Sequence, residues 1–275
     1  MKSLNLCLFV GIVACLHLAG FVVVLALNKD QVVQLYRSYI TWPDDGSTAF
    51  TRGSVAATKI SLKWLVAGYF FLSFFFQMYT AIFFDGYYKR LVQKNIQPYR
   101  WIEYAFSASC LFLVAAILNG VNDYHQILTI FFASFTVMML GLAQENWAYM
   151  IRSSEKKASF LFFAFPHLLG WPLYTTLWAA LLDQFVLAVN KSPRDPPKWV
   201  YSFYIVEFLI FSSFGFNQFT HMLRLYNCKF DDKKKAEKIA VQAEVAYVVL
   251  SLTSKTLSGY FLTSGLLASS GQGQM

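Results

Sequence analysis

A single lysine lies deep in the last apolar run of the chain. Lys255 stands about fifteen residues into this run, within Val248-Val-Leu-Ser-Leu-Thr-Ser-Lys255. A lysine at the centre of a membrane helix costs about 2.5–3.5 kcal/mol, and its stem is too short to reach a distant membrane surface. An amine in an apolar pocket is more readily deprotonated and is nucleophilic toward a carbonyl. The position favours a Schiff-base lysine; the alternative is a structural ion pair with a buried carboxylate.

The expected partner of this lysine is Glu103, just inside the third apolar run in Pro98-Tyr-Arg-Trp-Ile-Glu103. A protonated Schiff base is a buried cation, and an opposite charge within about 4–6 Å keeps it protonated. Glu103 lies nearer its helix end than Lys255 does, but helical side chains tilt toward the helix N-terminus and the lysine stem is long. The alternative is that Glu103 pairs with Arg100 at the membrane interface.

Further carboxylates lie in or near the apolar runs and suggest a relay. Glu244 and Lys255 are eleven residues apart, which puts them within about 20° of one helix face and some 16 Å apart along the axis. Intramembrane carboxylates can move protons. For Glu145, Glu207 and Glu244 taken singly, interhelical hydrogen bonding or interface anchoring is the competing interpretation. Glu207, about eight residues inside its run, is the strongest candidate.

The motifs of common enzymes and metal sites are absent from the sequence. It contains no HExxH, no GxSxG, no P-loop and no Cys/His cluster, so we expect neither an enzyme nor a metal centre. His167 and His221 are better explained as packed bundle residues than as metal ligands. Of four cysteines, Cys7, Cys15 and Cys110 lie inside apolar runs, which excludes a disulfide framework.

The composition identifies the environment in which these residues act. The 275 residues are 57% hydrophobic, 19% aromatic and only 14% charged. Soluble domains are usually about 45–50% apolar and about 25% charged, so a soluble or a disordered chain is excluded. The net charge of +8 arises from basic residues that flank the apolar runs, a distribution that indicates membrane topology and not nucleic-acid binding.

A bilayer core of about 30 Å needs roughly 20 apolar residues of helix. We therefore expect an all-α membrane protein, a single seven-helix transmembrane domain over residues 1–275. The first run is too long for the apolar part of a signal peptide and is expected to be a retained span. Pro166 and Pro172 should kink the fifth helix. The predicted spans are about 4–27, 60–84, 100–121, 127–150, 159–188, 199–223 and 240–268.

Basic residues in the connecting segments predict the orientation of the bundle. With the N-terminus in the cytoplasm, 14 lysines and arginines fall on the inner side and 8 on the outer side. Because positive residues concentrate in cytoplasmic loops, we expect a cytoplasmic N-terminus and an extracellular C-terminus. The outer segment 28–59 is too long for a connector. Alternating apolar residues over 31–42, followed by the turn signal Pro43-Asp-Asp-Gly46, predict a small strand or hairpin there.

Several stretches resemble the heliorhodopsins, a family of retinal proteins distinct from ordinary microbial rhodopsins. Arg100-Trp-Ile-Glu-Tyr-Ala-Phe-Ser-Ala-Ser109 looks like the third-helix signature of that family. Ser251-Leu-Thr-Ser-Lys255 resembles its seventh-helix attachment site, and Phe214-Gly-Phe-Asn-Gln-Phe219 resembles its sixth helix. Gln144-Glu145 also fits. The similarity covers all seven spans, and the third-helix stretch is its specific part.

The resemblance implies a chromophore and roles for individual residues. It implies that all-trans retinal is bound covalently to Lys255, with Glu103 as counterion and Ser251 hydrogen-bonded near the Schiff base. It also implies a homodimer, a cytoplasmic N-terminus and strands in the first outer loop. The other residues expected at the retinal are Tyr104, Ser107, Phe214, Asn217 and Gln218.

The second helix departs from the family pattern. Many members place a histidine there near the Schiff base, and the corresponding position here is Gln77, while His17 in the first helix is retained. Glutamine cannot titrate, which puts a proton-accepting pair of histidines in doubt. The expected candidates for a proton pathway are Arg100, His17, Gln77, Glu145, Glu207 and Glu244.

The favoured function is a light-absorbing photoreceptor whose bundle changes conformation and reports to a cytoplasmic partner. The alternative, from the transport class, is a light-driven or light-gated proton conductor that uses the intramembrane carboxylates. A ligand-activated seven-helix receptor is disfavoured by the inverted charge bias and by the absence of Asn-Pro-x-x-Tyr in the seventh run.

Overall fold

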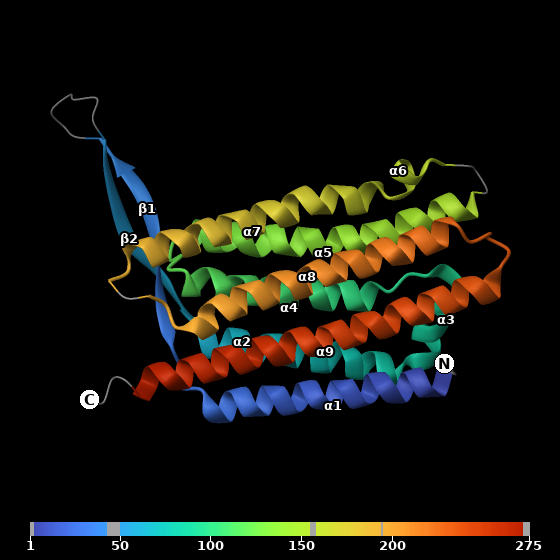
Figure 1. The fold of residues 1–275 in the computed structure, drawn as a ribbon, viewed down its shortest axis with the longest axis horizontal. Coiled ribbons are helices and arrows are strands. Elements are labelled where there is room, and N and C mark those ends of the chain that lie inside the picture. Colours follow the sequence, from blue (N-terminus) through green and yellow to red (C-terminus); the bar gives the residue numbers. More distant parts are fainter. Residues whose placement is uncertain (1–2, 43–49, 155–157, 194, 272–275) are drawn as a thin grey trace.

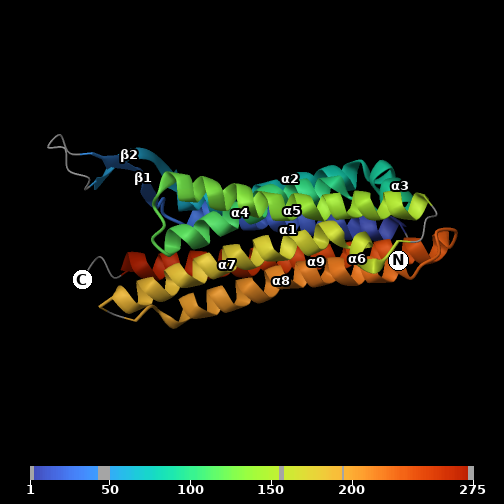
Figure 2. The ribbon, with the colours of Figure 1, turned by 90° about the horizontal axis from the view of Figure 1, so that it is seen from above.

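A computed structural model describes residues 3–42, 50–154, 158–193 and 195–271. Over these residues, seven helices are long and apolar enough to cross a membrane, as the sequence predicts. They lie side by side along the long axis of the molecule (Figures 1 and 2). Their bounds are α1 Ser3–Leu27, α2 Leu62–Ile82, α4 Pro98–Leu118, α5 Tyr124–Ser153, α7 Phe165–Lys191, α8 Lys198–Tyr226 and α9 Lys233–Gly271.

Two short helices differ from the prediction. The stretch expected to be a loop after the second span forms the amphipathic helix α3 (Phe84–Lys94), which packs on α9. α6 (Phe160–Phe163) is separated from α7 at Ala164. Pro166 therefore lies in the first turn of α7 and does not kink a continuous helix, because proline at that position costs no intrahelical hydrogen bond. Pro172 does lie inside α7.

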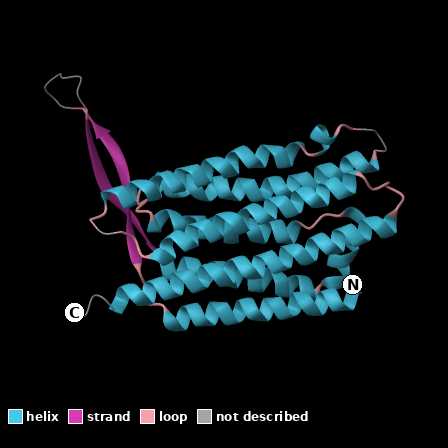
Figure 3. Cartoon of the chain, in the orientation of Figure 1, coloured by secondary structure: helices cyan, strands magenta, loops and turns pink. Residues whose placement is uncertain are grey.

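The first connecting segment forms a two-stranded antiparallel sheet, as predicted (Figure 3). β1 (Val32–Thr41) pairs with β2 (Thr51–Ser61), with a register irregularity at Leu35/Tyr36. The expected turn at Pro43–Gly46 lies outside the described residues. The side chain of Leu35 is buried, and it fixes the base of the hairpin to the bundle core.

Asp123 joins the hairpin to the helices. Its carboxylate caps α5 by accepting hydrogen bonds from the backbone N–H groups of His125 and Gln126, and it also accepts one from the Ser38 hydroxyl of β1 at 2.9 Å. These hydrogen bonds hold the pKa of Asp123 below its usual value, and the bond from the Gln126 N–H has the largest effect. The Tyr36 N–H donates to the Asn122 carbonyl, which continues the same attachment.

The two ends of the bundle are different. The end called here the hairpin end carries β1, β2 and the C-terminus, and the opposite α3 end carries α3, α6 and the N-terminus (Figure 1). Between them, small residues allow close packing: a Cβ at Gly20 of α1 or at Gly259 of α9 would overlap the Phe70 ring of α2. The three helices α1, α2 and α9 are thus held together around one aromatic side chain.

Candidate retinal site

Lys255 and Glu103 form a buried ion pair in the interior of the bundle. Lys255 Nζ donates to Glu103 Oε1 and to Ser251 Oγ, each at 2.8 Å, and both charged side chains are almost fully buried. The structure thus brings together the lysine and the carboxylate that lie 152 residues apart in the sequence. The difference in depth noted between the two positions is spanned by the long lysine stem. Lys255 Nζ also lies 5.3 Å from the centre of the Tyr104 ring, a favourable cation–π contact.

Two hydroxyl groups hold the carboxylate in place. Ser73 of α2 and Ser107 of α4 donate to the same Glu103 oxygen, at 2.6 Å and 2.8 Å. Sequence reasoning placed Ser107 here but missed Ser73. A signal was present, because Ser73, Gln77 and Thr80 recur at helical spacing in an otherwise apolar run and mark one polar face.

An apolar cavity opens beside the lysine. This lysine cavity has about 370 Å³ of empty space and a mostly aromatic and aliphatic lining, to which Ser107, Ser254 and Lys255 add polar groups. Three of the lining residues, Tyr104, Ser107 and Phe214, were expected at the retinal from the sequence. The other lining residues are Tyr69, Ala108, Leu111, Met138, Phe211 and Ser254.

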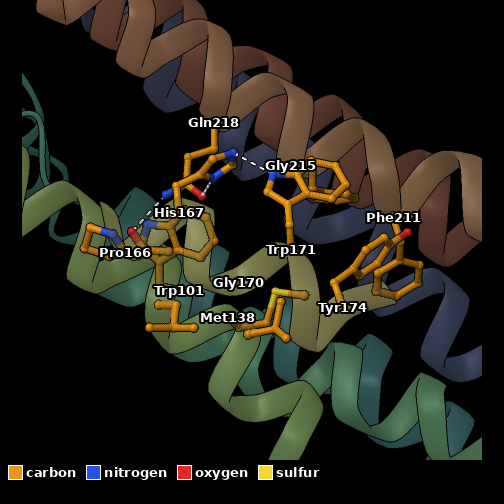
Figure 4. Close-up of a pocket in the computed structure, with 14 residues that line it drawn as sticks. Trp101, Met138, Pro166, His167, Gly170, Trp171, Tyr174, Phe211, Gly215 and Gln218 are labelled. Carbon is orange, nitrogen blue, oxygen red and sulfur yellow. Dashed lines mark hydrogen bonds between the residues drawn. The ribbon is translucent and has the colours of Figure 1, made fainter. Parts of the chain in front are cut away.

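A second cavity continues the first toward α7. This tryptophan cavity has about 520 Å³ of empty space between α5, α7 and α8, and Figure 4 shows its lining. Met138, Phe211 and Phe214 line both cavities, so the two lie next to each other and share these side chains. The two neighbouring cavities, which extend from Lys255 to Trp171, are together called the slot here. Trp101, His167, Tyr174 and Gln218 are the other large side chains of this second part.

Two glycines make the slot possible. A Cβ at Gly141 of α5 would lie within 2.2 Å of the Trp101 ring, and a Cβ at Gly215 of α8 would lie within 2.9 Å of the Trp171 ring. Neither position can hold a side chain without displacing a bulky indole, so the two glycines make room for the indoles of Trp101 and Trp171 in the cavity lining. Sequence analysis did not single out either glycine.

The expected residues Gln218 and Asn217 have different positions. Gln218 lines the tryptophan cavity, where its amide oxygen faces His167 Nδ1 at 3.1 Å and its amide nitrogen donates to the Gly141 carbonyl (Figure 4). Asn217 lines neither cavity. Its amide donates to the Ala243 carbonyl at 3.2 Å and so ties α8 to α9, because the two adjacent residues point to different sides of α8.

A second charge cluster lies one helical turn from Glu103. The guanidinium of Arg100 bonds both Glu145 of α5 and Glu244 of α9, and its carbon lies 4.0 Å from the Tyr247 ring centre. The alternative pairing of Arg100 with Glu103 is therefore wrong. Arg100 is buried in the bundle and does not belong to a connecting segment. The number of lysines and arginines assigned to the inner side therefore falls from 14 to 13.

A polar cavity separates the two clusters. It has about 360 Å³ of empty space and is lined by Gln77, Arg100, Glu103 and Glu244 among others. Gln77 faces the buried His17, with His17 Nδ1 3.1 Å from Gln77 Oε1. Five of the six residues expected in a proton pathway therefore lie in or next to one polar region on the α3 side of Lys255. Gln77, Arg100 and Glu244 line the cavity, His17 contacts Gln77, and Glu145 bonds to Arg100.

The sixth residue, Glu207, lies on the other side of Lys255. It accepts a hydrogen bond from the Ser258 hydroxyl, and Ser258 is three residues past Lys255 on α9. Glu207 is buried, and its Oε2 has no hydrogen-bond partner among the described residues. The hydroxyl of Tyr69, which lines the lysine cavity, is likewise unpartnered within the described part of the chain.

Comparison with known families assigns the fold. The family model described as Heliorhodopsin matches residues 6–267. The chain belongs to the heliorhodopsin family. No curated protein matches the chain. Membership indicates a retinal-binding, light-sensing membrane protein, and it agrees with the seven spans and the two-stranded sheet of this heliorhodopsin.

The slot fits the chromophore that the family implies. Retinal is a long, apolar aldehyde, and the slot is long and apolar with an amine at one end. The indoles of Trp101 and Trp171, for which Gly141 and Gly215 make room, are part of the lining that an apolar polyene would contact.

Removing the cation of the second cluster should destabilise the fold strongly. Arg100→Gln leaves Glu145 and Glu244 buried with no opposite charge, so the free energy of unfolding should fall by about 3–5 kcal/mol. Thermal or detergent-induced unfolding measures the loss. The matched control is Arg90→Gln on the exposed face of α3, which should be near neutral. Adding Glu145→Gln and Glu244→Gln to Arg100→Gln should recover much of the stability; equal stability of the Arg100 and Arg90 variants would contradict the ion pairs.

Proposed function

We propose that this heliorhodopsin is a photoreceptor in which all-trans retinal is bound covalently to Lys255 as a protonated Schiff base. The observation that carries the proposal is the buried Lys255–Glu103 pair beside an apolar cavity. A buried lysine with a single carboxylate partner is poised for carbonyl chemistry, and the same carboxylate can balance the positive charge of the linkage.

The residues around the lysine have separate tasks. Bound retinal supplies absorption of visible light and a light-driven change of shape. Glu103 balances the positive charge, and Ser73 and Ser107 fix the orientation of its carboxylate and spread its negative charge. Ser251, one turn before Lys255, accepts a hydrogen bond from the lysine nitrogen and holds the direction of its stem. The apolar walls exclude water and keep these charge interactions strong.

The helices that hold the pair also connect it to the α3 end. α4 carries Glu103 and, one turn away, Arg100; α9 carries Lys255 and, three turns away, Glu244. The Arg100–Glu244 bond therefore joins the same two helices that the Lys255–Glu103 bond joins. A change in the lysine contact alters the packing of α4 on α9 at both places, and this is our proposed route from light to a conformational signal. The proposed activity is binding and conformational change, without turnover of a substrate.

Orientation and assembly are part of the proposal. The basic residues of the α3 end support a cytoplasmic position for that end and an extracellular position for the hairpin end. A cytoplasmic signalling partner would then bind at the α3 end. A homodimer is supported by the family resemblance and by the hairpin, on which Ile40, Trp42 and Val55 are about half exposed or more.

A second candidate function is light-driven or light-gated proton conduction. The specific observation that favours it is Glu207, a buried carboxylate with an unpartnered oxygen on the hairpin side of Lys255. With the polar cavity on the α3 side, ionisable groups lie on both sides of the lysine. Intramembrane carboxylates in this arrangement are suited to proton transfer.

Loss of the lysine should abolish the pigment. Wild-type protein supplied with all-trans retinal should absorb in the visible, and Lys255→Ala should not, because the amine that forms the linkage is gone. Hydroxylamine, which attacks imines, should bleach the wild-type band. Lys63→Ala, which removes a lysine from the first turn of α2, is the control and should remain coloured. Colour in Lys255→Ala would refute the attachment site.

Neutralising Glu103 should change both titration and colour. Glu103→Gln removes the opposite charge beside the linkage, so the pH at which half of the visible band is lost should fall by about 1–3 pH units. Where the band survives, it should shift to the red, because the ground state loses charge stabilisation. Glu207→Gln is the control and should leave the dark spectrum nearly intact. Spectrophotometric titration that is unchanged in Glu103→Gln would exclude Glu103 as counterion.

Voltage clamp separates the two candidate functions. If the protein conducts protons, Glu207→Gln should reduce the photocurrent without bleaching the pigment, while Asp195→Asn at an exposed site should not. A wild-type protein that passes no photocurrent at any voltage or pH gradient would remove the conductor and leave the photoreceptor.

The orientation can be tested with terminal tags. A tag at residue 1 should bind antibody only after permeabilisation, and a tag after Met275 should bind antibody on intact cells, because basic residues concentrate at the α3 end. Surface labelling of the N-terminal tag would reverse the proposed orientation without affecting the retinal site.

A further inference from the structure

A separate polar cavity lies at the α3 end, next to the tryptophan cavity, with which it shares Gln218. It is formed by the last turns of α5, by α8 and by the Lys94–Asn95 link between α3 and α4. The side chains that matter for its chemistry are Lys94, Asn95, Arg152 and His221. Unlike the slot, it is lined by several charged and polar groups.

Several of these groups are buried without a partner. His221 and Asn95 are each only 5% exposed, and His221 Nε2 and Asn95 Oδ1 have no hydrogen bond within the described residues. Arg152 Nε and Nη2 are also buried and unpartnered there. The guanidinium carbon of Arg152 lies 5.7 Å from the Phe230 ring centre, and contact with a ring face leaves the in-plane N–H groups free. Leaving buried polar atoms unsatisfied costs about 1–3 kcal/mol each, so these atoms mark a place for a bound molecule.

The unpartnered groups are suited to an anion. Arg152 supplies two N–H donors, Lys94 supplies an ammonium, and His221 donates from Nε2 when its proton is on that nitrogen. Rotation of the Asn95 amide by half a turn would present its N–H₂ group instead of its oxygen. Together these side chains offer a fork of donors that matches the oxygens of a phosphate.

The charges around the cavity also favour an anion. Glu145 is the acidic residue in the lining, but its two oxygens already accept bonds from Arg100 and from the Gln97 N–H. Arg224 adds a further positive charge near His221. Lys94 and Arg152 thus face the cavity with no carboxylate of their own among the described residues.

The position of the cavity along the bundle suggests the source of such an anion. Arg152 lies in the last turn of α5, and Lys94 in the last turn of α3, at the end of the spans. This is the level at which lipid headgroups meet a membrane protein, and basic pockets between helices at this level bind acidic headgroups.

We propose that the α3-end cavity is a phosphate-binding site, held by Arg152, Lys94 and His221, which takes either free phosphate or the headgroup phosphate of an acidic lipid. Such a ligand would satisfy the buried donors and join α5 and α8 to the α3–α4 link, next to the Arg100 cluster.

The test uses the purified full chain and its thermal unfolding followed by intrinsic fluorescence. In one arm, inorganic phosphate is titrated against chloride at equal ionic strength; in the other, a short-chain phosphatidic acid is titrated against the matching phosphatidylcholine. The unfolding temperature of the wild-type protein should rise more with phosphate than with chloride, or more with phosphatidic acid than with phosphatidylcholine. A response in the first arm alone identifies free phosphate, and a response in the second alone identifies the lipid.

Variants locate the effect. Arg152→Gln should raise the ligand concentration needed for half of the stabilisation about tenfold or more. Arg152→Lys should be intermediate, because it keeps the positive charge but loses the paired N–H donors of the guanidinium. Arg90→Gln, with the same charge change on exposed α3, should respond like wild type. If Arg152→Gln does not fold, His221→Leu serves in its place. Absence of stabilisation in both arms, which would leave only water in the cavity, would overturn the proposal, and so would equal weakening by Arg90→Gln.

Discussion

The buried ammonium of Lys255 is the constraint on which the rest of the bundle depends. A charge in the membrane interior is tolerated only with a partner, and Glu103 provides it from a facing helix. That requirement fixes the register of α4 against α9 and brings α2 close enough for Ser73 to reach the same carboxylate. The apolar slot follows from the same arrangement, because its aromatic walls begin where these polar contacts end.

The Arg100 cluster repeats this arrangement nearer the α3 end. Its three charged groups come from α4, α5 and α9, so it adds α5 to the pair of helices that the lysine contact joins. α4 and α9 are joined by two buried ionic contacts, and neither can be stretched gradually at low cost. We therefore expect the two helices to pack in a few distinct arrangements and not over a continuous range. The structure therefore offers a physical basis for transmitting an event at Lys255 to the α3 end.

Much of this architecture could be predicted from the sequence, and the reasons are specific. The seven spans follow from run length, and the hairpin follows from alternation over 31–42. Lys255 and Glu103 could be identified because isolated charges in apolar runs are rare and costly. The Arg100–Glu145–Glu244 cluster could not be assembled in this way, because three charged residues on three helices allow several pairings.

Other features were missed because their signals are weak in one sequence. α3 is too short and too polar to be separated from a loop by hydropathy, although its faces are amphipathic. Gly141 and Gly215 are ordinary glycines until the indoles opposite them are placed. The break at Ala164 depends on how α6 packs against α5, where the Phe163 carbonyl accepts a hydrogen bond from the Gln144 side chain, and that contact is tertiary.

Lys255 is the proposed point of attachment of the chromophore, and one measurement tests this most directly. Illuminated pigment is reduced with borohydride, which converts an imine linkage into a stable amine, and the digested protein is mapped by mass spectrometry. The account predicts retinyl mass on the peptide that contains Lys255 and on no other lysine. Retinyl mass on a different lysine, or none on a visibly coloured protein, would contradict it.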